Sequence, residues 1–179
     1  MDRLASKVVL VTGGARGIGR GIALHAAAEG ARVVVADVGY EYDGSGAPSR
    51  APADKVVTEI EGAGGEALAV CEDVSTLEGA GRMVAAALDS FGRLDGVVNC
   101  AGIAVQKPLW EFEARDWDTV VAVHLRGQLP RHGQRGHVHG VGARAGAPGA
   151  PAAGGAGGAG RGRGGGGRGG ARGRARARG

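Results

Sequence analysis

The stretch VVLVTGGARGIG, residues 8–19, decides the fold of this 179-residue chain. Its first four residues form an aliphatic, mostly β-branched run of the kind that a parallel sheet buries on both faces. A glycine-rich turn follows, and apolar residues then recur at helical spacing from Ile18 to Glu29, where Gly30 predicts the end of a helix. The stretch therefore predicts a buried strand that passes through a tight turn into a helix.

The same order of strand and helix recurs up to about residue 127. Further strands are predicted over residues 32–36, 67–71 and 95–99, and further helices over residues 53–61, 77–91 and 115–127. Residues 39–52 are polar and rich in turn formers, so they read as a loop. Strands that alternate with helices of this length indicate an α/β fold, a Rossmann-like doubly wound parallel sheet of about four strands. Pro130 prevents the last helix from continuing.

The glycine-rich turn has the features of a dinucleotide-binding turn. Glycines let the backbone approach a pyrophosphate, and the following helix offers free N–H groups and the positive end of its dipole. Asp37 ends the second predicted strand, 18 residues after Gly19. A carboxylate there accepts hydrogen bonds from the adenosine ribose hydroxyls and repels a 2′-phosphate, which favours NAD over NADP. Arg16 keeps NADP as the alternative.

The glycine spacing TGxxxGxG at residues 12–19 and the motif Asn99-Cys100-Ala101-Gly102 resemble the short-chain dehydrogenase/reductase family. The resemblance covers residues 4–127. It implies the strand order 3-2-1-4 and an NAD(P)-dependent hydride transfer between a small-molecule alcohol and a ketone. It also implies a set of cofactor-binding residues: Gly13, Gly17 and Gly19 at the pyrophosphate, Ile18 close to the cofactor, Asp73 and Val74 at the adenine, and Asn99, Ala101 and Gly102 near the ribose and the nicotinamide.

Two residues of this set have a second interpretation. The side chain of Asn99 could pin neighbouring strands. Asp73 lies ahead of Ser75 near the start of a predicted helix, where an acidic side chain stabilises the helix N-terminus.

A finer resemblance comes from residues 39–52, residues 53–57 and the segment Val123-His124-Leu125-Arg126-Gly127. These look like the branch of the family that contains the (3R)-hydroxyacyl-CoA dehydrogenases. Most family members place an Asn of the proton relay where His124 stands. His124 therefore either serves the relay or packs its helix, and the sequence leaves both roles open.

The composition changes after Asp118, the last acidic residue. Residues 1–125 hold 11 Lys and Arg and all 18 Asp and Glu, whereas residues 126–179 hold 11 Arg and no acid. Residues 128–179 contain 20 Gly, 11 Ala and 10 Arg, too few large apolar groups to offset the entropy of ordering. We therefore divide the chain into an NAD(P)-binding part, residues 1–127, and a tail, residues 128–179, that we predict to be disordered.

The chemistry that the resemblance implies needs a Ser to orient the carbonyl, a Tyr to pass the proton and a Lys to lower the pKa of that Tyr. In this chain the last Ser, Tyr and Lys are Ser90, Tyr42 and Lys107, all ahead of the region where these residues belong. Gly, Ala, Arg and Pro have codons that begin with two G or C bases. We therefore interpret the tail as an out-of-frame reading of GC-rich DNA that begins near residues 127–130, and we expect an inactive chain.

Two other functions compete with this interpretation. A basic Arg/Gly-rich tail could bind nucleic acid through phosphates, but no aromatic residue follows Trp117 to stack on bases. The retained half could instead act as a cofactor-binding pseudoenzyme or sensor.

Location and assembly are also constrained by the sequence. The N-terminus lacks the apolar core of a signal peptide, and no run reaches the ~18 apolar residues of a membrane span. Cys71 and Cys100 fit buried thiols, so we expect a cytoplasmic protein. The resemblance implies oligomers built on helices that begin near Asp116, the first of which is cut short here. The predicted edge strand, residues 95–99, leads us to expect poor solubility and weak or no NAD binding.

Overall fold

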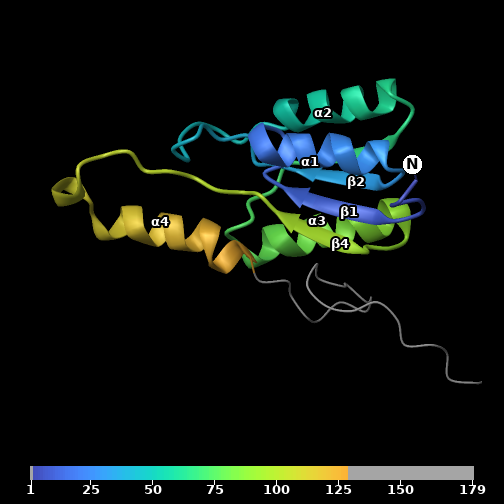
Figure 1. The fold of residues 1–179 in the computed structure, drawn as a ribbon. Coiled ribbons are helices and arrows are strands. Elements are labelled where there is room, and N and C mark those ends of the chain that lie inside the picture. Colours follow the sequence, from blue (N-terminus) through green and yellow to red (C-terminus); the bar gives the residue numbers. More distant parts are fainter. Residues whose placement is uncertain (1, 129–179) are drawn as a thin grey trace, which may run out of the picture. The chain divides into compact units, whose positions relative to one another are not determined.

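The computed structural model describes residues 2–128 (Figure 1). Apart from Gln128, the tail for which we predict disorder lies outside the described residues, and so do ten of the arginines that would bind nucleic acid. Within residues 2–128 no helix is long and apolar enough to cross a membrane.

The centre of the fold is a parallel sheet with the predicted strand order, β3-β2-β1-β4. The strands are β1 (Val8–Thr12), β2 (Arg32–Ala36), β3 (Glu66–Val70) and β4 (Gly96–Asn99). β1 is an inner strand, because Val9 pairs with Val33 of β2 on one side and with Gly96 of β4 on the other. All five residues of β1 are buried, which explains why its sequence is an unbroken aliphatic run.

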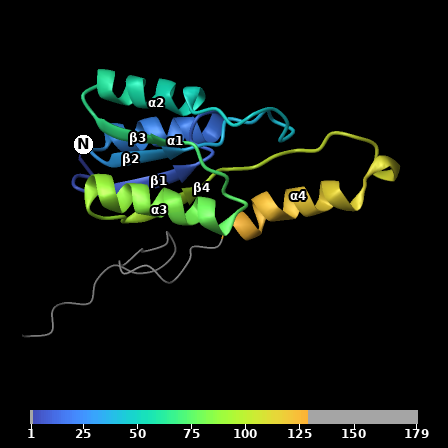
Figure 2. The ribbon, with the colours of Figure 1, turned by 180° about the vertical axis from the view of Figure 1, so that it is seen from behind.

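Helices cover both faces of the sheet. The helices α1 (Gly17–Ala28) and α2 (Ala51–Gly62) lie on one face, and α3 (Leu77–Phe91) lies on the other (Figures 1 and 2). Side chains of β1 alternate between the two cores: Val9 and Val11 pack with α1 and α2, whereas Val8 and Leu10 pack with α3. This alternation follows from the two-residue period of a strand.

The predicted helices are confirmed with small changes in their limits. α2 begins at Ala51, two residues before its predicted start, because Pro52 occupies the first turn, where its missing N–H costs nothing. α3 begins after Thr76, whose hydroxyl accepts a hydrogen bond from the Gly79 N–H, and ends at Gly92 with a left-handed φ of 75°.

The last described elements are the 3₁₀ turns η1 (Leu109–Glu111) and η2 (Arg126–Gln128) and, between them, the helix α4 (Ala114–His124). α4 ends three residues before its predicted limit. Glu113 and Asp116 form a capping box at its start. No residue of α4 is buried, and Trp117 is 67% exposed. The helix is therefore set by local signals rather than by packing against a core.

The start of β4 is fastened to β1 by one carboxylate. The Val8 N–H donates to Oδ2 of Asp95 at 2.8 Å, and Arg93 donates to both carboxylate oxygens at 2.8 and 2.5 Å. Burial raises the pKa of Asp95, but the hydrogen bonds from Arg93 and Val8 outweigh it and hold the pKa below its ordinary value of 3.8. On its other side, β4 has no strand partner within the described part of the chain.

Candidate dinucleotide-binding site

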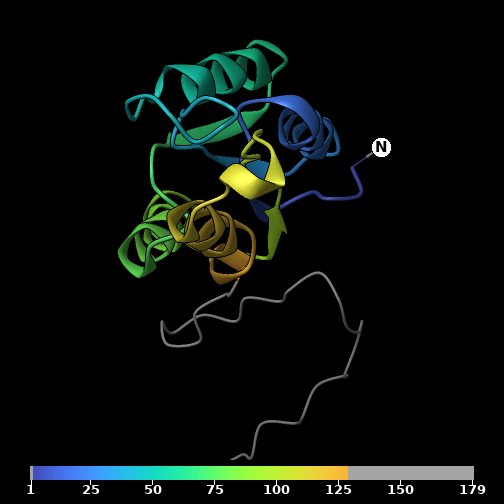
Figure 3. The same cartoon turned by 90° about the vertical axis from the view of Figure 1, so that its left-hand side faces the viewer.

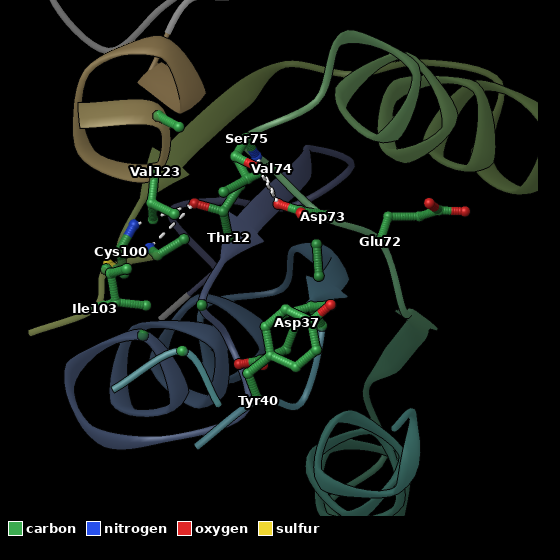
Figure 4. Close-up of a pocket in the computed structure, with 18 of the residues that line it drawn as sticks. Thr12, Asp37, Tyr40, Glu72, Asp73, Val74, Ser75, Cys100, Ile103 and Val123 are labelled. Atoms are coloured by element: carbon green, nitrogen blue, oxygen red, sulfur yellow. Dashed lines mark hydrogen bonds between the residues drawn. The ribbon is translucent and has the colours of Figure 1, made fainter. Parts of the chain in front are cut away.

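A cleft of about 860 Å³ lies where the carboxyl ends of the strands meet the starts of the helices. Figure 3 looks toward these strand ends, and Figure 4 shows the lining side chains. This is the edge at which open α/β sheets bind ligands. Of the eleven residues predicted to bind the cofactor, ten line the cleft: Gly13, Arg16, Gly17, Ile18, Gly19, Asp37, Asp73, Val74, Ala101 and Gly102.

Gly13, Gly17 and Gly19 are glycines for different structural reasons. A Cβ on Gly13 would lie 2.7 Å from Cα of Ala101, and a Cβ on Gly19 would overlap the carbonyl of Gly13, so these two positions require glycine for packing. Gly17 has a left-handed φ of 49°, and a Cβ there would meet nothing within 4 Å. Gly17 therefore leaves open space in the cleft, where a ligand's pyrophosphate could approach the backbone closely.

The N-terminus of α1 faces the same space. The first N–H groups of a helix have no partner within it, and no side chain caps this one. Free amides and the positive end of the helix dipole make this place suited to an anion. Ile18 lies beside these amides and is 78% exposed, an apolar side chain that a bound ligand would cover.

Asp37 is held at the end of β2 by the backbone. Its Oδ2 accepts the Ala15 N–H at 3.0 Å, and its Oδ1 accepts the Gly39 N–H at 2.8 Å. The two bonds fix the carboxylate at the wall of the cleft and leave further lone pairs on both oxygens. Arg16 lies nearby, half-exposed, and donates to the carbonyl of Tyr40 at 3.0 Å. An acidic and a basic side chain thus both line this part of the cleft.

Thr12 builds the floor of the cleft. It is 4% exposed, and its hydroxyl oxygen accepts the N–H groups of Cys100 and Ala101, both at 3.3 Å (Figure 4). Asn99, the eleventh predicted residue, ends β4 outside the cleft lining. Its side chain is exposed.

Asp73 and Val74 lie in the turn between β3 and α3. Oδ1 of Asp73 accepts the N–H of Ser75 at 2.8 Å and its hydroxyl at 2.7 Å (Figure 4). The residue that caps α3 is Thr76, three positions after Asp73. Asp73 instead shapes the turn that presents Val74 to the cleft.

His124 lies directly beside the cleft. Its Nε2 is 2.9 Å from the carbonyl oxygen of Ile103 and 3.1 Å from the Ile103 nitrogen. A Cβ on Gly102 would lie 2.7 Å from Cε1 of His124, so the glycine permits this approach. The side chain fastens α4 to the segment after β4, which is a positioning contact.

The cysteine thiols and the tyrosines are the reactive side chains at or near the cleft. Burial raises the pKa of the Cys100 thiol, and both cysteines are free thiols. Tyr40 and Tyr42 line the cleft from the β2–α2 loop, but no lysine stands among the described residues that line it. Within residues 2–128 no cluster of His, Cys, Asp and Glu could hold a metal ion.

The motifs did not single out every residue that shapes the cleft. Thr12 opens the TGxxxGxG motif without a predicted role at the cleft, and Tyr40 and Ile103 are not predicted to lie there. A signal existed only for Thr12, which is a polar residue that closes a buried aliphatic run. The contributions of Tyr40 and Ile103 depend on how two loops meet in space.

The sequence matches the short chain dehydrogenase family over residues 7–130. The chain is 46% identical over 127 residues to the peroxisomal multifunctional enzyme type 2 of Mus musculus, covering 71% of this chain and 17% of that one. It is 42% identical over 126 residues to a hydroxyacyl-CoA dehydrogenase of Mycobacterium tuberculosis, covering 70% and 38%.

A solved structure agrees with these matches. The crystal structure of a short chain dehydrogenase from Mycobacterium avium superposes with a TM-score of 0.61 and 44% identity, and the match covers 69% of this chain and 42% of that one. The chain thus spans less than half of the length of each of these relatives. With the strand order, the glycine turn and these matches in agreement, the chain belongs to the short-chain dehydrogenase family.

Proposed function

We propose that residues 1–127 are the cofactor half of an alcohol/ketone oxidoreductase and that they bind NAD in preference to NADP. The observation that supports this most is Asp37, whose carboxylate is fixed by two backbone N–H groups at the wall of the cleft. A fixed negative charge repels a 2′-phosphate and accepts hydrogen bonds from ribose hydroxyls. When bound, the dinucleotide supplies or accepts the hydride, and the residues of this half hold and orient it.

The cofactor preference is tested by titrating the protein with NADH and NADPH and following nicotinamide fluorescence. We expect NADH to bind at least about tenfold more tightly, a difference that one charge–charge contact near a protein surface can supply. Asp37→Asn removes the charge and keeps one oxygen acceptor, so one of the two N–H groups, that of Ala15 or that of Gly39, loses its partner. This variant should narrow the difference, whereas Arg16→Ala should weaken NADPH more than NADH. Equal affinities in the unaltered protein would contradict the proposal.

The substrate class that we propose is a hydroxyacyl thioester and its ketone, as the names of the relatives suggest.

We also propose that this chain binds the dinucleotide without turning it over. The cleft lacks a lysine among its described lining residues, and no Tyr follows Tyr42 in the sequence. The measurement is NADH oxidation with an acetoacetyl thioester. NADH binding with no turnover is the expected result, and turnover at a rate typical of enzymes would refute inactivity.

We further propose that the reading frame changes near residues 127–130. The family match, which ends at residue 130, and the loss of acidic residues after Asp118 both support this. Reading the coding DNA in the two other frames after codon 127 tests it, because a Ser and a YxxxK motif should reappear in one of them. Their absence from both frames would remove the proposal.

The free thiols of Cys71 and Cys100 support a reducing compartment such as the cytoplasm.

A further inference from the structure

The loop between β2 and α2 forms one wall of the dinucleotide cleft. We call residues 39–46 of this loop the strap. Four of its residues line the cleft, namely Tyr40, Glu41, Tyr42 and Gly44, opposite the lining contributed by the β3–α3 turn. In Figure 4 the ring of Tyr40 lies next to Asp37, at the place proposed for the adenosine ribose.

The strap is tied to the segment that follows β4. The Ala104 N–H donates to the carbonyl of Tyr42 at 3.1 Å. Gly44 lies against the side chain of Ile103, because a Cβ on Gly44 would lie 3.5 Å from Cδ1 and Cγ2 of Ile103. Figure 1 shows both pieces of chain extending past the carboxyl ends of the strands. The cleft is therefore bridged on this side by one hydrogen bond and one apolar contact.

Internal bonds make the strap a compact unit. The Glu41 N–H donates to the Ser45 carbonyl at 2.9 Å, and the Gly44 N–H donates to the Glu41 carbonyl at 3.0 Å. At its ends stand Gly39 and Gly46, with left-handed φ angles of 78° and 98°. Glycines tolerate changes of φ that other residues do not. The strap can thus swing as a body between two glycines.

Few contacts oppose such a movement. Glu41, Tyr42, Asp43 and Ser45 are exposed, and Tyr42 is 66% exposed. Apart from the tie, the Gly39 N–H donates to Oδ1 of Asp37 at 2.8 Å. The Arg16 guanidinium contacts the Tyr40 carbonyl at 3.0 Å and the Glu41 carboxylate at 3.8 Å. Segments with so little buried apolar surface open at a low free-energy cost.

We propose that the strap is the cover of the dinucleotide site: its tie to Ile103 and Ala104 opens for the dinucleotide to enter, and closes over the adenosine half once it is bound. The proposal rests on dinucleotide binding as proposed above. It adds that the strap sets the rates of entry and exit. Because His124 holds the backbone of Ile103, the anchor of the tie is itself fixed to α4.

A reversible lock tests the strap. A Cβ on Gly44 would lie 4.0 Å from Cβ of Ile103, within the range that a disulfide spans. The full chain carrying Gly44→Cys and Ile103→Cys is compared in its oxidised and reduced forms, so both forms bear the same substitutions. The two single variants, treated with the same oxidant, control for the native Cys71 and Cys100.

NADH is the probe, and its binding kinetics are followed by stopped-flow fluorescence. Oxidation before loading should slow association at least about tenfold, and oxidation after loading should slow dissociation by a similar factor, as expected for a closed cover. Reduction should restore both rates. Equal rates in the two forms would overturn the proposal, and so would failure of the double variant to form an intramolecular disulfide.

A second measurement separates the strap from the binding proposal. In the unaltered chain without ligand, hydrogen exchange at the Ala104 amide reports the tie directly, and protection is the expected result. Exchange as fast as in an unstructured peptide would overturn the tie. If the disulfide forms and Ala104 is protected but NADH fails to bind the reduced protein, the function proposed for the cleft is wrong, and the role of the strap in entry falls with it.

Discussion

At the scale of single residues, Gly17 and Gly21 form a natural pair for testing the glycine turn. A Cβ at either position would meet nothing within 4 Å, but only Gly17 has a left-handed φ. Gly17→Ala should lower NADH affinity at least about tenfold, because the methyl group occupies the space left for the pyrophosphate and the backbone is strained by about 1–2 kcal/mol. Gly21→Ala should leave binding intact and stabilise α1 by about 0.5–1 kcal/mol. Titration and thermal unfolding of both variants check this, and equal affinities would contradict it.

Thr12 offers a second test at this scale. Thr12→Val keeps the shape of the side chain but leaves the Ala101 N–H without its acceptor. We expect the free energy of unfolding to fall by about 1–3 kcal/mol and NADH affinity to fall with it, since the floor of the cleft loosens. Thr12→Ser keeps the oxygen and should preserve binding. Chemical denaturation and fluorescence titration measure the two effects, and a Val variant with unchanged affinity would argue against Thr12 as the support of the floor.

The residue scale is also where sequence reasoning was both strongest and weakest. Short-range motifs placed ten of the eleven predicted cofactor residues at the cleft, because the turn geometry that glycines permit is local. Asn99 belongs to an equally short motif, yet it lies outside the cleft lining, at the end of β4. The contact between Gly44 and Ile103 joins residues 59 positions apart, and no local sequence pattern predicts it.

At the scale of elements, Asp95 joins β4 to β1. The pKa of Asp95 is held below 3.8, so its contribution to stability is full above that pH and is lost as the pH falls below it, through the lower pKa of the folded state. Asp95→Asn should lower the free energy of unfolding at neutral pH by about 1–3 kcal/mol. The free energy of unfolding of this variant should also fall less steeply as the pH is lowered into the acid range. Asp89→Asn, on the exposed side of α3, is the control that should change little. Urea titrations across a pH series decide the matter.

Element limits were predictable where a chemical signal marks them. Gly92 and Pro52 set the end of α3 and the start of α2. The alternation of β1 side chains between two cores, however, cannot be read from Val8 to Val11, which are all aliphatic. The packing of the two cores shows that Val8 and Leu10 face α3.

At the scale of the whole molecule, the outer edge of β4 is the feature with the largest expected effect on behaviour. Within the described residues that edge has no partner strand, and open edges template pairing between chains. We expect the protein to associate as its concentration rises, measured by light scattering. Leu109→Ser with Trp110→Ser removes two highly exposed apolar side chains away from the edge and should leave association in place. A monomer in this double variant would assign association to η1 instead.

The position of β1 has a consequence for synthesis on the ribosome. The first strand to emerge is an inner strand, and its partner β2 follows after a single helix, so half of the sheet can pair while the remainder is still being translated. All buried residues of the core beneath α1 and α2 lie within the first 69 positions. The core on the opposite face is complete only after Met83, Ala87 and Leu94 have been translated. Folding should therefore be vectorial: one layer matures first, and the nascent chain carries a half-covered sheet until α3 arrives.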